Sequence, residues 1–167
     1  TGWTVGQQMI FADECALAPA PTPHIFNITM LGPVIIRFGN DAQRAFFLPK
    51  LLNGDILACQ GFSEPGAGSD LASLQTSCKR VEGGWVVNGS KIWTSSAHYA
   101  DWIFCLVRTD TKAAKKQAGI SFIVLDLKSP GISVRSIIGI DGRHSLNQVF
   151  FDEVFMPESG LIGEENK

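Results

Sequence analysis

The sequence contains no apolar run long enough to cross a membrane. Its longest apolar stretch, residues 25–38, is interrupted by Asn27, Gly32 and Pro33, whereas a membrane-spanning helix needs about 20 mostly apolar residues. The pattern of a secretory leader, a basic start followed by an apolar centre and a cleavage site, is also missing. We therefore expect neither membrane association nor export, and we predict a cytoplasmic protein.

The sequence has no large excess of either basic or acidic residues. Fourteen Lys and Arg against sixteen Asp and Glu give a formal net charge of −2 over 167 residues, so no global field attracts nucleic acid or an anionic membrane. We expect no nucleic-acid partner, and any polyanionic ligand must be bound locally. With 45% hydrophobic residues, the chain is long enough for one good core or two small ones.

Potential metal ligands are few and widely separated. The four cysteines are Cys15, Cys59, Cys78 and Cys105. Their spacing fits neither a zinc site nor a disulfide framework, so we expect buried thiols in a reducing compartment. The histidines are equally scattered, at His24, His98 and His144. We predict structural or surface roles for them rather than a metal site or a catalytic triad.

The first third of the chain has helical periodicity. Apolar residues at helical spacing predict a helix over residues 5–16, which must end before the prolines at 19, 21 and 23. A second helical segment over residues 25–35 is expected to kink or split at Pro33 and to end at Gly39. Asn40 followed by Gln43 resembles a capping box, which predicts a short third helix before Pro49.

The rest of the chain is rich in strand signals. Residues 74–87 predict a hairpin, Asn88-Gly89 a second turn, and the blocks 101–108, 120–127, 132–140 and 149–155 further strands. Residues 102–107 are apolar on both faces, as in a central strand, whereas residues 132–140 alternate as if one face met water. The prediction is an α+β fold, with a helical segment (1–55) followed by an antiparallel β-barrel or sandwich (56–167).

A Gly/Pro-rich loop, residues 60–70, lies where the helical period changes to the strand period. Gly66 and Gly68 permit close approach to bare backbone, and the hydroxyls of Ser63 and Ser69 could hold a phosphate or a ring carbonyl without fixed charge. An ordinary surface turn is the alternative. The loop lacks the third glycine of a dinucleotide fingerprint and the lysine of a phosphate loop, and Pro65 argues against a serine-hydrolase elbow.

A second polar cluster follows in residues 91–98, KIWTSSAH. Trp93 offers a wide apolar surface for stacking a planar heterocycle, and the hydroxyls of Thr94 and Ser95 could donate to ring nitrogens or carbonyls. A buried Trp beside a polar turn would explain the same residues.

Four motifs in order carry a resemblance to a known family. They are FGNDAQR at 38–44, SEPGAGSD at 63–70, NGSKIWTS at 88–95 and FDEVFMP at 151–157. Together they resemble the acyl-CoA dehydrogenase family over almost the whole chain. The resemblance implies a flavoenzyme with a helical N-terminal domain, a β middle domain and a C-terminal helical bundle. Since the chain opens on Thr1, we expect a fragment that holds the end of the first domain and the second.

The resemblance also implies residue roles. Ser63 would bond the pyrimidine end of FAD, Ser95 would bond near flavin N5 and O4, Trp93 would cover one ring face, and Ser69 would lie near the pyrophosphate and the CoA arm. The implied cofactor contacts are Gln60, Phe62, Ser63, Ser69, Trp93, Thr94 and Ser95, with Ser69 also a substrate contact.

The resemblance implies no catalytic residue here, because the family's base is a Glu in the C-terminal domain. It implies an acyl-CoA substrate, an electron-transfer flavoprotein or similar acceptor, and homo- or hetero-oligomers. Departures occur at Gln60, often aromatic in relatives, at Thr94-Ser95, where many have Ile-Thr, and at Ala97-His98, usually a Gly pair. A flavin monooxygenase or oxidase, or an inactive binding or assembly module, are the alternative functions.

Overall fold

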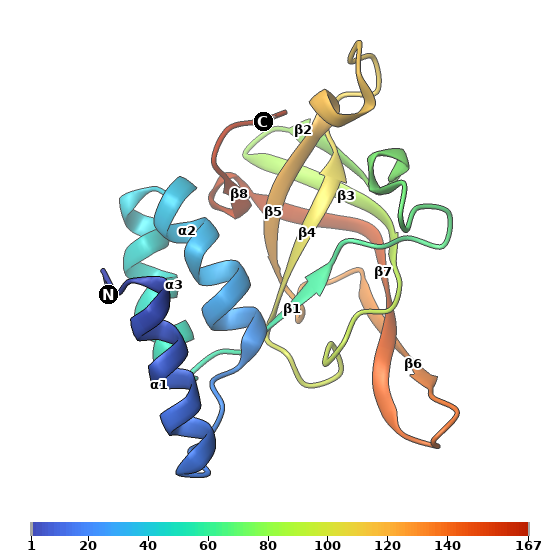
Figure 1. The fold of residues 1–167 in the computed structure, drawn as a ribbon. Helices are drawn as coiled ribbons and strands as arrows, with labels where there is room; N and C mark the ends of the chain where they lie inside the picture. Colours follow the sequence, from blue (N-terminus) through green and yellow to red (C-terminus); the bar gives the residue numbers. More distant parts are fainter. Residues whose placement is uncertain (1, 167) are drawn as a thin grey trace.

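The computed structural model describes residues 2–166 and shows a helical layer against one face of a curved sheet (Figure 1). The helical layer contains α1 (Val5–Leu17), a π-helical turn (Phe26–Leu31) that runs directly into α2 (Gly32–Phe38), and α3 (Asp41–Asn53). Within residues 2–166, no helix combines the length and apolar character needed to cross a membrane.

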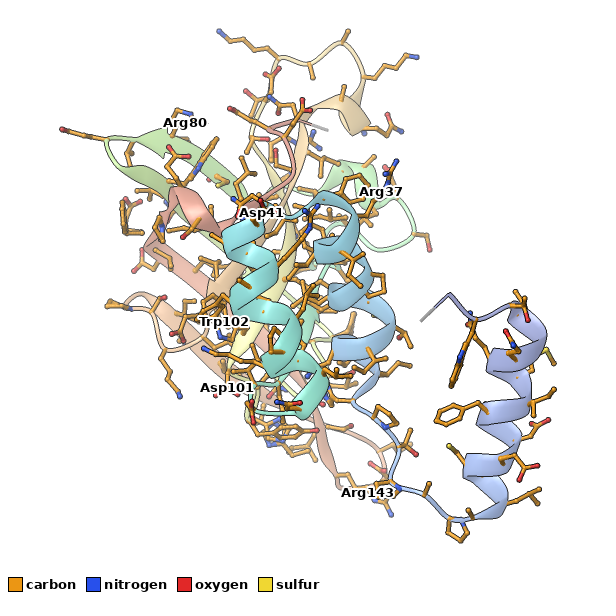
Figure 2. The ribbon with its side chains drawn as sticks, turned by 90° about the vertical axis from the view of Figure 1, so that its left-hand side faces the viewer. Arg37, Asp41, Arg80, Asp101, Trp102 and Arg143 are labelled. Atoms are coloured by element: carbon orange, nitrogen blue, oxygen red, sulfur yellow. The ribbon has the colours of Figure 1, made fainter. Side chains whose placement is uncertain are left out.

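Two helices begin at the signals that the sequence contains. Thr4 caps α1 in a reciprocal capping box with Gln7, and Asn40 caps α3 in the same way with Gln43. At Pro33 the helix changes from π-helical to α-helical geometry without a break, since this proline lies in the first turn of α2, and Gly39 ends that helix as predicted. No residue of α1 is buried, and Figure 2 shows this helix standing apart from α2 and α3.

The expectation that the third helix ends before Pro49 is wrong. Helix α3 continues through Pro49 to Asn53, where Gly54 ends it in the left-handed conformation (φ 76°). A proline inside a helix costs about 3 kcal/mol. Phe47 and Leu51, on either side of Pro49, are both buried, and we attribute the continued helix to this packing together with the glycine cap.

Among residues 2–166, eight strands form one open, mostly antiparallel sheet. They are β1 (Ala58–Gly61), β2 (Ser77–Val81), β3 (Gly84–Lys91), β4 (Trp102–Arg108), β5 (Ile120–Asp126), β6 (Ile132–Ile138), β7 (His144–Pro157) and β8 (Leu161–Ile162). Their order is β6-β7-β3-β2-β4-β5-β8, with β1 parallel to β4 off this path. The path does not close on itself, so the sheet is not a complete barrel.

Strand β4 separates two cores, as its two-sided apolar sequence predicts. Ile103, Cys105 and Val107 face a core enclosed by the curved sheet. Phe104 faces the opposite way, into a second core that includes Leu31 and Phe47 from the helices. At the strand's start, Trp102 packs edge-on against Phe47 of α3 with ring centroids 4.9 Å apart, and Figure 2 shows Trp102 beside this helix. The helices are thereby packed onto the outer face of β4.

The predicted turn at Asn88-Gly89 is instead an irregularity inside β3. The strand runs on to Lys91, and its register against β7 shifts between Val87 and Gly89. Gly89 has φ 143°, and a Cβ there would lie 2.7 Å from the Thr76 Cα. Glycine therefore creates a bulge that lets neighbouring backbone approach, which a two-residue sequence signal does not distinguish from a turn.

The expectation of one buried face for residues 132–140 is also wrong. Strand β6 pairs only with β7 at the end of the sheet, and none of its residues is buried. Ile138 is 59% exposed and Ile140, beyond the strand, is fully exposed.

The α+β class, with helices first and an antiparallel sheet second, is confirmed. The division into domains 1–55 and 56–167 stays a prediction.

Gln43→Ala is expected to lower the free energy of unfolding by about 2 kcal/mol, because it removes a capping box and leaves two carbonyls unpaired. The Gln43 amide donates to Ser159 O (2.8 Å) and Leu161 O (2.7 Å), which ties α3 to the last strand. Urea unfolding measures the change. Gln7→Ala, which breaks the matching but exposed capping box of α1, should cost about 1 kcal/mol or less. Equal losses would contradict this role for Gln43.

Candidate functional site

A closed turn forms the start of the predicted binding loop. Directly after β1, the backbone groups of Glu64 and Ala67 exchange two hydrogen bonds, of 2.9 and 3.0 Å. Gly66 and Gly68 have no atom within 4 Å of the place where a Cβ would stand, and neither has a positive φ. These glycines therefore leave the loop surface open to an approaching group rather than providing an unusual backbone conformation.

Lys91 joins this loop to the second predicted segment. Its side chain is completely buried, and its Nζ lies 2.7 Å from Glu64 Oε1 and 3.2 Å from Phe62 O, to which it donates. The next backbone amide, Ile92 N, donates to Ser63 O at 2.9 Å. Residues 60–70 and 91–98, far apart in the sequence, are thus held side by side.

The Glu64 carboxylate is held from two directions. Besides Lys91, it accepts hydrogen bonds from the backbone amides of Gln75 (2.6 Å) and Thr76 (2.9 Å). Burial acts to raise the pKa of Glu64, but the hydrogen bonds from Lys91, Thr76 and Gln75 outweigh it, and the pKa lies below the ordinary 4.5. The charged carboxylate therefore stabilises the fold above pH 4.5, and this contribution is lost as the pH falls through the lower folded pKa.

The second segment contains strained backbone. Trp93 (φ 60°) and Ser96 (φ 67°) both occupy the left-handed region, at a cost of about 1–2 kcal/mol for a residue with a side chain. Trp93 is also 58% exposed, whereas Ser95 is half-buried. Strain of this kind concentrates at binding and catalytic sites. The backbone presents the indole to the exterior beside a hydroxyl.

Thr94, between Trp93 and Ser95, anchors the segment. Its N–H donates to Asn147 O (2.9 Å), and its carbonyl accepts from the Asn147 side-chain amide (3.0 Å). Its side chain is fully buried, and its hydroxyl has no hydrogen-bond partner among residues 2–166. These bonds make Thr94 an anchor for the segment, and its predicted contact with a cofactor stays a prediction.

The remaining predicted contacts lie along the loop at different depths. Gln60 and Ser63 are half-buried and Ser69 is exposed. The Phe62 ring packs edge-on against Phe104, with ring centroids 5.9 Å apart, so it contributes to the second core. The structure therefore brings Ser63 close to the 91–98 segment, whereas Ser69 lies beyond the Glu64–Ala67 turn.

A polar pocket of about 440 Å³ borders the loop. It is lined by Glu64, Pro65, Gly66, Ser73, Gln75, Thr76, Gly89, Ser90 and Phe150. A second, mainly apolar cavity of about 490 Å³ lies elsewhere, between α3 and the ends of β5 and β7. None of the predicted contacts lines either space, but the polar pocket borders the loop through Glu64, Pro65 and Gly66. The pocket beside the loop is the one that a ligand held by residues 60–69 would adjoin.

Sequence reasoning missed the residues that hold the two segments. Lys91 and Glu64 lie within the predicted motifs, but no role was predicted for either of them. No sequence signal points to Asn147. The description of the histidines as scattered is wrong for two of them, because His98 and His144 stack with ring centroids 4.0 Å apart. Only the fold brings them together. No group of three or more His, Cys, Asp or Glu among the described residues could hold a metal ion.

The expectation of buried thiols holds for three of the four cysteines. All four are free; Cys59, Cys78 and Cys105 are buried, and Cys15 is half-buried. Burial is the main cause that raises the pKa of Cys78 and of Cys105 to about 12. These two thiols are therefore protonated at neutral pH, and we assign them packing roles.

Comparison with known proteins agrees with the order of the motifs. Residues 1–55 match the acyl-CoA dehydrogenase N-terminal domain, and residues 59–154 match the acyl-CoA dehydrogenase middle domain. The helices and the sheet thus correspond to the N-terminal and middle domains of one class of protein. The chain belongs to the acyl-CoA dehydrogenase family.

Two curated relatives come from Mycobacterium tuberculosis. The acyl-CoA dehydrogenase IpdE1 is 42% identical over 163 residues, which cover 97% of this chain and 42% of IpdE1. The acyl-CoA dehydrogenase FadE34 is 41% identical over 165 residues, which cover 99% of this chain and 23% of FadE34. This chain therefore spans less than half the length of either relative. The sequences around Cys59 and His98 also resemble the large subunit of pimeloyl-CoA dehydrogenase. This narrower resemblance stays a prediction.

Solved structures share the fold. The Tcur3481-Tcur3483 steroid ACAD superposes with a TM-score of 0.89 at 36% identity, over 99% of this chain and 42% of that one. The ChsE4-ChsE5 complex from Mycobacterium tuberculosis gives 0.88 at 39% identity, over 99% of this chain and 42% of that one. PigA, solved with FAD and proline, gives 0.78 at 27% identity, over 84% of this chain and 37% of PigA.

The residues present fit a flavin. An exposed indole in strained backbone, a neighbouring half-buried hydroxyl and an open glycine loop supply an apolar surface and uncharged donors. A planar ring with polar edges needs both. Ser63, Ser69, Trp93 and Ser95 are the residues that would hold it.

Lys91→Met is expected to lower the free energy of unfolding by about 3–5 kcal/mol, because it leaves the Glu64 carboxylate buried and uncompensated. Lys91→Met combined with Glu64→Gln should recover part of this loss. Chemical denaturation monitored by circular dichroism measures both. Lys116→Met, which removes the exposed partner of Asp70 at 3.8 Å, should cost less than about 1 kcal/mol. A loss for Lys91→Met as small as that of the control would contradict the role of the buried pair.

Proposed function

We propose that this chain forms the FAD-facing part of an acyl-CoA dehydrogenase, which removes an α-proton and a β-hydride from an acyl-CoA thioester. The observation that carries the proposal is the joint between the two segments: Lys91 and Ile92 hold residues 60–69 beside residues 93–95. Family membership supports the class of chemistry, and the contact between the two segments supports our assignment of it to these residues.

The two serines would act as aimed donors. Bound FAD would supply the hydride acceptor at N5 of its ring. Ser63 would donate toward the pyrimidine end of the ring, and Ser95 would donate near N5 and O4. Negative charge grows in this region during reduction, and preorganised donors lower the barrier when they stabilise developing charge. Ser63 lies beside the buried Lys91–Glu64 pair and Ser95 beside the Asn147 anchor, which would limit their movement.

Trp93 would cover one face of the ring, and its exposed indole already presents the necessary surface. Gln60 and Phe62 would line the start of the contact segment, Phe62 mainly through its backbone. Ser69, exposed beyond the turn, would lie near the pyrophosphate and the CoA arm of the substrate.

The catalytic base and the electron acceptor would lie outside this chain. We place the α-proton base, a Glu by family resemblance, in a C-terminal helical domain, consistent with a chain that spans 42% of IpdE1. Electron-transfer flavoprotein or a similar protein would reoxidise the cofactor. The two-component names Tcur3481-Tcur3483 and ChsE4-ChsE5 support a hetero-oligomer, and the steroid name of the former makes polycyclic CoA esters candidate substrates. A cytoplasmic location stays a prediction.

A second function on the same scaffold is oxidation of a different substrate. PigA is solved with FAD and proline, so an amino-acid derivative is the alternative substrate class, and an oxidase or monooxygenase the alternative reaction. A binding or assembly module without turnover is the third possibility.

The whole protein that carries this chain is expected to purify with FAD and to lose its flavin absorbance when acyl-CoA is added without oxygen. Anaerobic titration with short, long and polycyclic acyl-CoA esters measures this and ranks the substrates. A colourless protein that takes up no FAD would defeat the proposal. Fast oxygen consumption after reduction would favour the oxidase, and the 167-residue chain alone should show no turnover.

Trp93→Gly is expected to change stability and flavin binding in opposite directions. Glycine relieves the left-handed strain and should raise the free energy of unfolding by about 1 kcal/mol. Loss of the indole should weaken FAD binding roughly tenfold, since one stacked aromatic is worth about 1 kcal/mol or more. Fluorescence titration with FAD and thermal unfolding measure the two effects. Trp3→Ala, which changes another exposed Trp, should alter neither, and unchanged FAD affinity in Trp93→Gly would remove Trp93 from the site.

A further inference from the structure

Two histidine side chains meet on one buried amide directly behind the 93–95 segment. Asn147 is completely buried. Its Oδ1 lies 2.7 Å from His144 Nε2, and its Nδ2 lies 3.1 Å from His98 Nδ1 and 3.0 Å from Thr94 O. His98 and His144 stack above it, while both remain exposed to solvent. One amide therefore connects two titratable rings to the backbone of the segment.

The Thr94 carbonyl decides which way the Asn147 amide faces. A carbonyl only accepts, so the Asn147 atom beside it must be the NH₂ group. The amide oxygen then faces His144, which must carry a proton on Nε2 to donate to it. The second amide hydrogen points at His98 Nδ1, which must be unprotonated to accept it. The network is complete only while His98 is neutral.

We propose that Asn147 is a positioning residue for the 93–95 segment, and that His98 and His144 hold its amide so that protonation of His98 releases the segment. A proton on His98 Nδ1 would make this nitrogen a hydrogen-bond donor that faces the Asn147 NH₂ group, which is also a donor, so the hydrogen bond between them would be lost. The amide can then pair with the ring only by turning, and turning brings its oxygen against Thr94 O. Protonation of His98 is thereby linked to loss of the Thr94 anchor.

The surroundings of the two rings agree with a neutral His98. From its own segment, the Tyr99 ring packs edge-on against His98 with centroids 4.6 Å apart, and from β7 the facing group is His144. Arg143, next to His144 in the chain, is paired with Asp141 at 3.7 Å. Partial desolvation and the neighbouring His144 lower the pKa of His98 below 6.5. The unfolded chain then binds more protons, so the anchored state weakens as the pH falls below 6.5.

Nuclear magnetic resonance on the 167-residue chain tests the link without any cofactor. The expected result is a neutral His98 with its proton on Nε2. As His98 titrates, hydrogen exchange at the Thr94 and Ser96 amides, which donate to Asn147 O and Ser145 O, should rise roughly tenfold after correction for its intrinsic pH dependence, as expected for loss of about one hydrogen bond. A proton on Nδ1 of neutral His98, or titration of His98 without any change at these amides, would overturn the proposal.

Variants separate positioning from simple packing. Asn147→Asp keeps the shape but replaces the donor by a carboxylate, so the pKa of His98 should rise by about one unit. If that variant does not fold, His98→Ala, at an exposed position, should abolish the acid-dependent exchange at Thr94. Asn88→Ala, which removes another sheet amide bonded to Glu153 at 2.7 Å, should change neither. An unaltered acid response in His98→Ala would contradict the role of this ring.

The consequence for the cofactor rests on the proposed function. In the whole protein, FAD affinity should fall several-fold on acidification through the His98 pKa, and His98→Ala should flatten this dependence. Absence of FAD binding at every pH would defeat the proposed function alone, because the exchange experiment needs no cofactor. If FAD affinity fell equally in the wild type and in His98→Ala, the release of the 93–95 segment would have no effect on FAD binding.

Discussion

The buried ion pair between Lys91 and Glu64 is the interaction on which the candidate site depends. It lies inside the protein, where an unpaired charge is costly, and breaking such a pair typically costs about 3–5 kcal/mol out of a total stability of about 5–15. Its second effect is geometric. Lys91 ends β3 and also donates to Phe62 O, while Glu64 accepts from the amides before β2. One charge pair therefore fixes three segments that lie close only in the folded chain.

The sheet supplies the frame for that pair. Strand β4 has a core on each side, and the strands around it carry the loop and the 91–98 segment from the same curved sheet. The helices pack on the outer face of β4 and so stabilise the frame. On the other side of the 93–95 segment, β7 contributes Asn147. The strained Trp93 backbone thus lies between two buried polar groups, to which we attribute its left-handed conformation.

Local signals predicted local features well. The capping residue Asn40 and the proline at 33 act through groups within a few residues, so their local effects could be predicted. Predictions failed where distant packing outweighed the local rule. Helix α3 passes through Pro49 because Phe47 and Leu51 are buried on either side of it, and Asn88-Gly89 lies inside a strand because Thr76 and β7 meet it there. Strand β6 has the alternation of a half-buried strand but nothing to cover it within residues 2–166.

The family, the order of helices and strands, and the two segments that carry hydroxyls, glycines and Trp93 can be read from the sequence, because these are properties of short ordered motifs. Only the tertiary structure decided how the segments are held. In the folded chain, Lys91 is buried against Glu64, and the Thr94 side chain is buried while Trp93 is exposed. His98 stacks on His144, although the two are 46 residues apart in the sequence. The physical reason is that burial and pairing depend on what the chain folds against, and a residue's sequence neighbours do not specify it.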